Sequence, residues 1–302
     1  MKTRYKGNLI SRPSDTILNI IFIIYSLICI LPLFLVLSVS FSDELSIAKN
    51  GYSFIPQKFS LTAYSYLFLN AKGILNAYGV TIFVTVVGSV LSVIIIALYA
   101  YPLSRRDFKY RNTFTFLVFI TMIFSGGLVP WYLVCTRVLH LQNTIGALIV
   151  PYLMNGWYVL IMRTFFSTTI PESIIEAAKI DGAGEFRIFA VVVLPLAKPA
   201  IATIALFNTL FYWNDWWLPL MLINDDKFVN LQYIMYRITT NIQYLTQLAP
   251  NAAAQSGNTI AQMPSETARM AMCILSIGPV IIAYPFFQKY FVKGLTIGGV
   301  KG

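Results

Sequence analysis

Residues 176–195 form a charged segment between two apolar stretches of the chain. The segment combines small residues with carboxylates. These residue types suit contact with another protein, because two adjacent alanines let a partner surface approach closely. Pro171 and Glu172 just before the segment are typical of a helix start, where an acid is favoured by the helix dipole. Gly182 predicts a turn, and a second short helix is expected to stop at Pro195.

A second group of residues could contact a carbohydrate. Asp215 is the only acid inside any apolar stretch long enough to span a membrane, and an ionisable residue there is by default a functional candidate. Aromatic faces stack on the C–H surfaces of sugar rings, while carboxylates and amides hydrogen-bond hydroxyls. For the tryptophans, an aromatic belt at the membrane interface is the alternative. The candidates for this path are Asn155, Trp157, Tyr158, Tyr212, Trp213, Asn214, Asp215 and Trp216.

Other kinds of chemistry are missing from the sequence. No Gly-Lys dipeptide occurs, so there is no Walker A loop for ATP phosphates, and neither HExxH nor GxSxG is present. Cys29, Cys135 and Cys273 lack zinc spacing and form no disulfide framework. His140 stands alone in a short loop, whereas a catalytic site needs partners. We therefore expect no catalytic residue, metal site or cofactor in this chain.

The composition is that of a membrane protein. Hydrophobic residues make up 57% of the 302 residues and charged residues 11%, which is more apolar sequence than a soluble protein of this length can hide. The formal charge of +10 is spread between apolar stretches instead of forming one patch, so nucleic acid is not an expected partner. The first apolar run is too long for a removable signal peptide.

Six stretches are apolar enough and close enough to the required length of about 20 residues to span a membrane as helices. They predict an all-α membrane protein with six transmembrane helices. Several contain glycine or proline, which membrane helices tolerate where neighbours satisfy the freed backbone groups. The expected spans are residues 17–41, 77–101, 113–134, 144–162, 200–223 and 267–287.

The distribution of Lys and Arg orients these spans. Fifteen of the 22 basic residues fall on one side and six on the other, and basic loops favour the cytoplasm. Both termini and the loop 163–199 are therefore expected in the cytoplasm, with the long loops 42–76 and 224–266 outside. Apolar residues at helical spacing predict an amphipathic helix over 231–248, followed by a loop. Its role, as a membrane-surface cap or a contact with a partner or substrate, is left open.

The spacing in residues 176–195 resembles the coupling motif of bacterial ABC importer permeases: Glu-Ala-Ala, three residues, Gly, nine residues, an aliphatic residue, one residue, Leu-Pro. Val192 stands where the family more often has Ile, which preserves shape and polarity. The run from Trp213 to Trp216, followed by Pro219, resembles a signature in the fifth span of carbohydrate-type permeases.

The resemblance extends over essentially the whole chain. Residues 286–302 are similar to the tail of the maltose-permease inner-subunit group, which implies that the tail after Lys293 reaches between two ATPases. Likeness to the subgroup for complex oligosaccharides lies in residues 124–130, 161–166 and 262–267.

The resemblance implies one permease domain, residues 1–302, that forms half of a translocation path in the cytoplasmic membrane, surrounded by lipid. It implies a second permease, two ATPase subunits that bind ATP and Mg, an extracellular solute-binding protein and an oligosaccharide substrate. The cytoplasmic coupling helix would dock on one ATPase. The residues implied in coupling are Glu176, Ala177, Ala178, Asp181, Gly182, Leu194 and Pro195.

Two other kinds of transporter are considered beside this one. An ABC importer for a non-sugar solute would share the coupling motif, and only the carbohydrate-type motifs speak against it. An ion-coupled secondary carrier would need inverted repeats and coupling-ion carboxylates near the membrane midplane. Asp215, as the only acid in any span, argues against the carrier. A membrane enzyme would need paired acids or a nucleophile with its base, and neither is found.

Overall fold

The computed structural model describes residues 12–69, 71–252 and 266–298. Within these ranges the chain is mainly helical, and its β pairing is limited to one antiparallel bridge between Ser42 and Phe59. The expected all-α class is thus confirmed for the described part of the chain.

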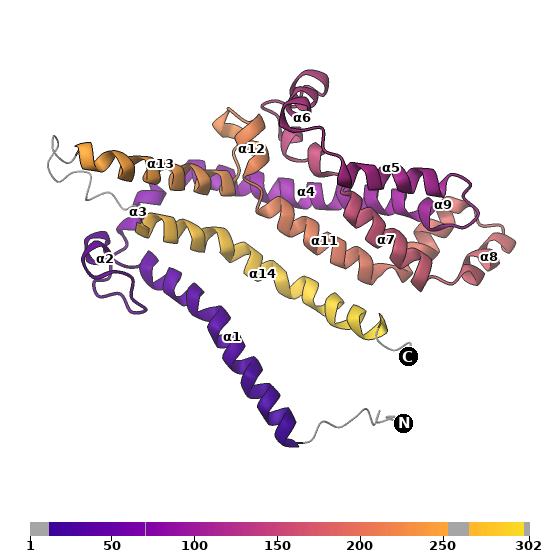
Figure 1. Cartoon of the computed structure of the whole chain (residues 1–302), viewed down its shortest axis with the longest axis horizontal. Helices are drawn as coiled ribbons and strands as arrows, with labels where there is room; N and C mark the ends of the chain where they lie inside the picture. The colour runs from indigo at the N-terminus through magenta and orange to yellow at the C-terminus, as the bar shows by residue number, and fades with distance from the viewer. Residues whose placement is uncertain (1–11, 70, 253–265, 299–302) are drawn as a thin grey trace. The chain divides into compact units, whose positions relative to one another are not determined.

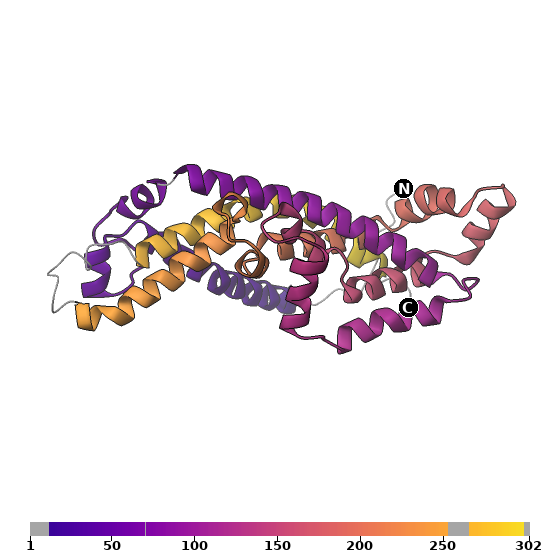
Figure 2. The same cartoon turned by 90° about the horizontal axis from the view of Figure 1, so that it is seen from above.

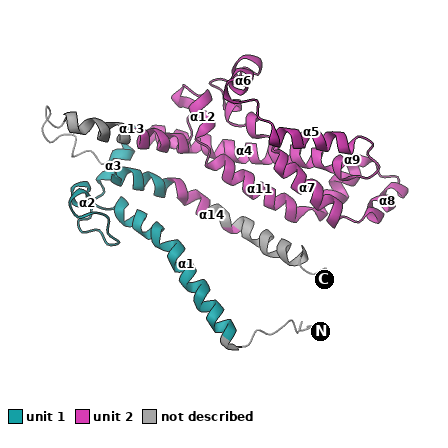
Figure 3. Cartoon of the chain, in the orientation of Figure 1, with its two compact units in different colours: residues 1–69, 241–275 teal, residues 70–240, 276–302 magenta. Residues whose placement is uncertain are grey.

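The chain divides into two compact units (Figure 3). They consist of residues 1–69 with 241–275, and of residues 70–240 with 276–302. The first unit contains α1 (Arg12–Ser40), α2 (Glu44–Asn50), α3 (Thr62–Phe68) and the start of α14 (Glu266–Gly298).

The longest element of the first unit that lies wholly within it is α1, with 29 residues. At 1.5 Å per residue it is about 44 Å long, enough to cross the hydrocarbon core of about 30 Å. Most of its large apolar side chains are exposed within the chain. The carboxylate of Glu44 accepts hydrogen bonds from the backbone N–H groups of Glu266 and Thr267, at 2.9 and 3.0 Å. It thereby satisfies donors that the first turn of α14 leaves unpaired.

The second unit is built around α4 (Ala71–Ser104), with α11 (Lys198–Trp213) and α7 (Gly156–Thr169) packed along it (Figures 1 and 2). Gly88 allows the close approach of α4 and α11, because a Cβ there would lie 2.7 Å from the ring of Tyr212. The other α-helices are α5 (Arg111–Ile123), α6 (Leu128–Leu133), α8 (Glu172–Ile180), α9 (Glu185–Arg187), α10 (Leu194–Leu196), α12 (Trp217–Leu222) and the start of α13 (Leu231–Ala252). Short 3-10 and π-helical turns are η1 (Val134–Val138), η2 (Ile145–Leu148), η3 (Val150–Tyr152), η4 (Ile188–Val193) and η5 (Asp226–Phe228).

Two hydrophobic clusters pack against different halves of α4. The cluster at its C-terminal half joins Ile96 to Met162 of α7 and to Ile188 of η4, and so supports the chain around α8. The cluster at its N-terminal half joins Val84 to Leu218 of α12, and so supports the start of α13. Both candidate groups of functional residues are therefore fixed to the same long helix.

Three of the six expected spans consist of more than one helical segment, and their assignment as membrane spans stays a prediction. In residues 113–134, α5 and α6 are separated by a turn and bent by 114°, because Gly127 adopts a φ of 87° that no helix continues. In residues 144–162, η2 and η3 meet α7 at 50°, and α7 begins where Asn155 caps it. In residues 200–223, α11 ends at Trp213 and α12 starts afresh.

By length and composition, two of the described helices could cross a membrane alone, Ser14–Ser40 and Ala71–Ser104. Up to five crossings result if each of three bent helix pairs counts as one. The third of these pairs joins Glu185–Leu196 to Lys198–Trp213 with a bend of 80°.

The expected amphipathic helix over 231–248 is confirmed as α13, which continues to Ala252 where a loop was expected. Residues 253–265, the remainder of that loop, lie outside the described residues. The expected C-terminal tail begins inside α14, which runs to Gly298, and residues 299–302 also lie outside them.

Candidate functional site

The segment around Glu176 forms the short helix α8, which protrudes at the end of the second unit where α4 ends (Figures 1 and 2). Pro171 lies directly before the first helical residue, Glu172, as the sequence predicted. Ile175 is buried in the cluster around the C-terminal half of α4 and anchors one side of the helix.

The end of α8 is a Schellman turn. The N–H of Gly182 donates to the carbonyl of Lys179 at 3.0 Å, and the N–H of Ala183 donates to the carbonyl of Ala178 at 2.9 Å. Gly182 has a φ of 77°, in the left-handed region that favours glycine. Asp181 is the last residue before this turn. The predicted turn at Gly182 is therefore confirmed.

The outer side of α8 and the helix after it expose apolar and small residues. Ile180 is 87% exposed and Phe186 is 76% exposed, while Glu176, Ala177 and Asp181 are also exposed. Exposed large apolar side chains on a protruding segment are typical of an interaction surface.

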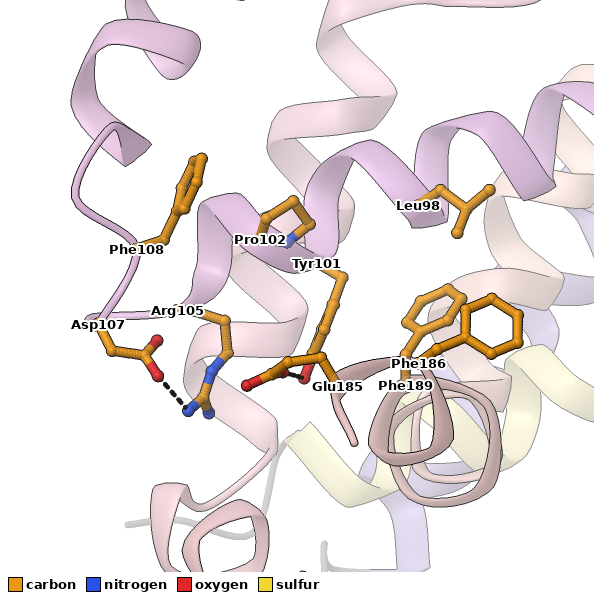
Figure 4. Close-up of a pocket in the computed structure, with 9 residues that line it drawn as sticks. All are labelled: Leu98, Tyr101, Pro102, Arg105, Asp107, Phe108, Glu185, Phe186 and Phe189. Atoms are coloured by element: carbon orange, nitrogen blue, oxygen red, sulfur yellow. Dashed lines mark hydrogen bonds and ion pairs between the residues drawn. The ribbon is translucent and has the colours of Figure 1, made fainter. Parts of the chain in front are cut away.

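The inner side of α8 is tied to the loop after α4 and to α9 by ion pairs. Lys179 Nζ lies 2.8 Å from Asp107 Oδ2 and 2.8 Å from Glu185 Oε1. The Tyr101 hydroxyl at the end of α4 donates to Glu185 Oε2 at 2.8 Å, and Arg105 pairs with Asp107 at 3.2 Å (Figure 4). One lysine thus connects the loop after α4, the end of α8 and the start of α9.

This arrangement changes how the ionisable groups titrate. The hydrogen bond from Lys179 lowers the pKa of Asp107 below its ordinary value, and Arg105 acts in the same direction. The hydrogen bond from Lys179 also lowers the pKa of Glu185. The bond to Asp107, and then the bond to Glu185, raise the pKa of Lys179. All three groups are therefore charged at neutral pH.

A pocket of about 420 Å³ lies beside these ion pairs, between the end of α4 and the start of α9. Figure 4 shows its aromatic lining from Phe108, Phe186 and Phe189, and the carboxylate and guanidinium of Glu185 and Arg105 at its polar side. The second part of the motif lies at the far end of the same helical run. Leu194 packs against the cluster around the C-terminal half of α4, and the run ends at Leu196, one residue beyond the predicted stop at Pro195.

Two of the residues predicted to line a carbohydrate path are buried in the second unit. Tyr212 is 1% exposed, and its hydroxyl donates to the carbonyl of Ile149 at 3.0 Å. Trp213 is also buried, and its indole N–H donates to the carbonyl of Ser276 at 3.0 Å.

Asp215 caps the start of α12. Its Oδ1 accepts hydrogen bonds from the N–H of Trp217 at 3.1 Å, the N–H of Leu218 at 3.3 Å and the hydroxyl of Tyr152 at 3.3 Å. Its carbonyl accepts a bond from the amide of Asn230. The carboxylate is buried and holds the backbone between α11 and α13.

Asn155 likewise caps a helix, because its Oδ1 accepts from the N–H groups of Trp157 and Tyr158 at the start of α7. The Trp157 ring is exposed, and the Tyr158 ring stacks on Phe207 of α11 with centroids 6.1 Å apart. Asn214 and Trp216 are exposed beside the buried Asp215. Among the described residues, no hydrogen bond, ion pair or ring contact joins the Asn155 group to the residues from Trp213 to Trp216.

Sequence reasoning missed the residues that hold α8 in place. Asp107 is 72 residues from Lys179 in the sequence, and Glu185 does not occupy a position of the coupling motif. No spacing rule therefore points to either residue. The one available signal was an acid among the basic residues of the loop after α4. Tyr101 could not be recognised as a partner of Glu185 from the sequence, because a tyrosine at the end of an apolar stretch is common in membrane spans.

Comparison with known proteins identifies the family. Residues 79–297 match the model of the binding-protein-dependent transport system inner membrane component family. A polygalacturonan/rhamnogalacturonan transport system permease protein of Bacillus subtilis (strain 168) is 36% identical, over 97% of this chain and 99% of the relative. An arabinooligosaccharides transport system permease protein of Halalkalibacterium halodurans is 30% identical, over 95% of this chain and 96% of the relative.

A solved structure shares the fold. The crystal structure of a bacterial ABC transporter involved in the import of the acidic polysaccharide alginate contains a chain that matches with a TM-score of 0.76 and 31% identity. The match covers 94% of this chain and all of that one. From the family match and from relatives similar over nearly their full length, the chain belongs to the family of binding-protein-dependent transport system inner membrane components.

Proposed function

We propose that the chain is the permease subunit of an ATP-driven ABC importer for oligosaccharides in the cytoplasmic membrane. Family membership supports an importer and makes an ion-coupled carrier the poorer account. The substrates for which the relatives are named, polygalacturonan, rhamnogalacturonan and arabinooligosaccharides, support a carbohydrate cargo over a non-sugar solute.

The proposed layout has six membrane crossings in one permease domain. They are α1, α4, the bent α5–α6 segment, the segment from η2 to α7, the segment from α11 to α12, and α14. Both termini and the loop 163–199 lie in the cytoplasm, and loops 42–76 and 224–266 lie outside. The excess of Lys and Arg on one side supports this orientation.

In this layout α8 is a cytoplasmic coupling helix that docks on one of two ATPase subunits. Those subunits bind ATP and Mg, a second permease completes the path, and a solute-binding protein delivers the sugar from outside. The observation that carries the proposal is the two-sided character of α8. It exposes small and apolar residues outward, while Lys179 fixes its inner side to Asp107 and Glu185. A displacement of α8 by the ATPase would therefore move the end of α4.

The test is purification and reconstitution of the complex. The chain is tagged at its N-terminus, extracted from native membranes in mild detergent, and its partners are identified. We expect a P-loop ATPase and a second permease, and ATP-dependent uptake of an oligosaccharide by proteoliposomes that also receive the solute-binding protein. Recovery of the chain alone, under detergent conditions that preserve a known importer, would contradict the proposal.

A further inference from the structure

The start of α13 is fixed by a buried network of polar groups. The side-chain Oδ1 of Asn230 accepts from the N–H of Tyr233, and its amide donates to the carbonyl of Asp215. The N–H of Leu231 donates to the hydroxyl of Thr81 on α4 at 2.9 Å. Because Asn230 and Leu231 are buried, these bonds hold the first turns of α13 at a defined place beside α12.

A row of aromatic rings lies across this junction. Trp216 stacks on Tyr236 with centroids 4.7 Å apart and an angle of 12° between the planes. Tyr236 and Tyr233 are also nearly parallel, with centroids 6.3 Å apart. The guanidinium of Arg237 lies 5.8 Å from the Tyr233 ring centroid. Residues three and four apart share one face of a helix, so the row follows one face of α13.

Hydrogen-bonding groups border the rings. The Gln232 amide lies 3.5 Å from Asn214 Oδ1, and Asn214 is exposed. Arg237 pairs with Asp226 at 2.7 Å, and both side chains are substantially exposed. An exposed ion pair is weak, at about 0–1 kcal/mol, and the Asn214 amide also donates to the carbonyl of Leu210 at 2.8 Å, so a sugar hydroxyl would replace one of these partners.

We propose that Trp216, Tyr233 and Tyr236, with the amides of Asn214 and Gln232, form an oligosaccharide-contact surface at the α12–α13 junction. The inference rests on the proposed importer function and gives α13 a role in handling its cargo. The Trp216 ring is 41% exposed and offers an apolar surface to the C–H faces of pyranose or furanose units, with the half-buried Tyr236 stacked behind it. The bordering amides match the sugar hydroxyls.

The test uses the complete importer in proteoliposomes, with uptake of trigalacturonate and of arabinotriose measured against concentration. Trp216→Ala and Tyr236→Ala are each expected to raise the half-saturating concentration of the transported sugar by about twofold to twelvefold, from stacking contributions of about 0.5–1.5 kcal/mol. Tyr236→Phe keeps the ring and is expected to retain near-normal uptake. Phe116→Ala removes an exposed ring of α5 that stacks on no described ring, and is the matched control.

The outcomes separate the two claims. If the wild-type importer takes up a sugar and neither alanine variant changes that uptake, the proposed contact surface is overturned. The importer function then still stands. If the wild-type complex has an active ATPase but takes up neither sugar, the result would count against the oligosaccharide function itself. Docking of the sugar-free solute-binding protein is measured in parallel. If the alanine variants and Tyr236→Phe all weaken this docking equally, the aromatic row is a protein interface and the proposal is overturned.

Discussion

Replacing Gly182 by alanine tests whether the shape of the α8 turn matters for coupling. Gly182 has a φ of 77°, whereas the neighbouring Gly184 has a φ of −69°. A Cβ at either position meets no atom within 4 Å, so backbone strain is the main difference between the two substitutions. A non-glycine residue in the left-handed region costs about 1–2 kcal/mol. At Gly184 the same change is expected to be neutral or slightly stabilising.

The strain falls on the two hydrogen bonds that close α8, those donated by Gly182 and Ala183. A cost of 1–2 kcal/mol raises the open population of the turn by about 5–30-fold. Hydrogen exchange of these amides in the purified complex should rise accordingly in Gly182→Ala, and sugar uptake per ATP hydrolysed should fall. Gly184→Ala should change neither quantity. Equal behaviour of the two variants would refute the argument that the turn conformation carries coupling.

Three further predictions concern the helix anchor and the core. Lys179→Met should lower uptake per ATP while the complex still assembles, because it removes both ion pairs between α8 and its neighbours; unchanged coupling would contradict this. The pKa values of Asp107 and Glu185 are lowered, so their pairs contribute fully above about pH 4.5 and are lost as pH falls through the lowered values. Exchange protection of α8 should therefore decline below pH 4.5, and a decline centred near neutral pH would contradict the assignment. Gly88→Leu should reduce the amount of folded protein recovered after extraction, because a Cβ alone already lies 2.7 Å from the Tyr212 ring; normal recovery would show that α4 and α11 are not packed this closely.

Local rules predicted the parts of the coupling segment that depend on local physics. Pro171 before the helix, the left-handed glycine at 182 and the end near Pro195 each follow from backbone geometry or a missing N–H. The ion pairs of Lys179 with Asp107 and Glu185 could not be predicted in the same way. They depend on how the loop after α4 packs against α8, and a lysine on a helix gives no sign of its partner.

The carbohydrate candidates show where residue type is an incomplete guide. Tyr212 and Trp213 were selected as aromatic residues in a membrane span, yet both are buried and hydrogen-bonded to backbone carbonyls. In a helix that is apolar on most sides, periodicity does not say which face meets a neighbour. Asp215 follows α11 and its carboxylate caps α12. Its assignment to the substrate path stays a prediction.

The positions of the breaks inside the expected spans could not be located from hydropathy. Residues 113–134 are apolar throughout, but Gly127 turns the backbone between α5 and α6. Hydropathy indicates whether a segment prefers lipid or water, and it contains no information on where the backbone bends. Glycine is common in membrane helices, so its presence alone did not mark the break.

Photocrosslinking from Ala177 tests the central claim most directly. A photoreactive amino acid is placed at this exposed position of α8 in the native complex, and the same residue is placed at Lys227 as a control for the opposite, external side. Crosslinking from Ala177 to a P-loop ATPase, absent from position 227, is the predicted result. An Ala177 probe that yields no ATPase adduct in a complex from which the ATPase co-purifies would contradict the assignment of α8 as the coupling helix.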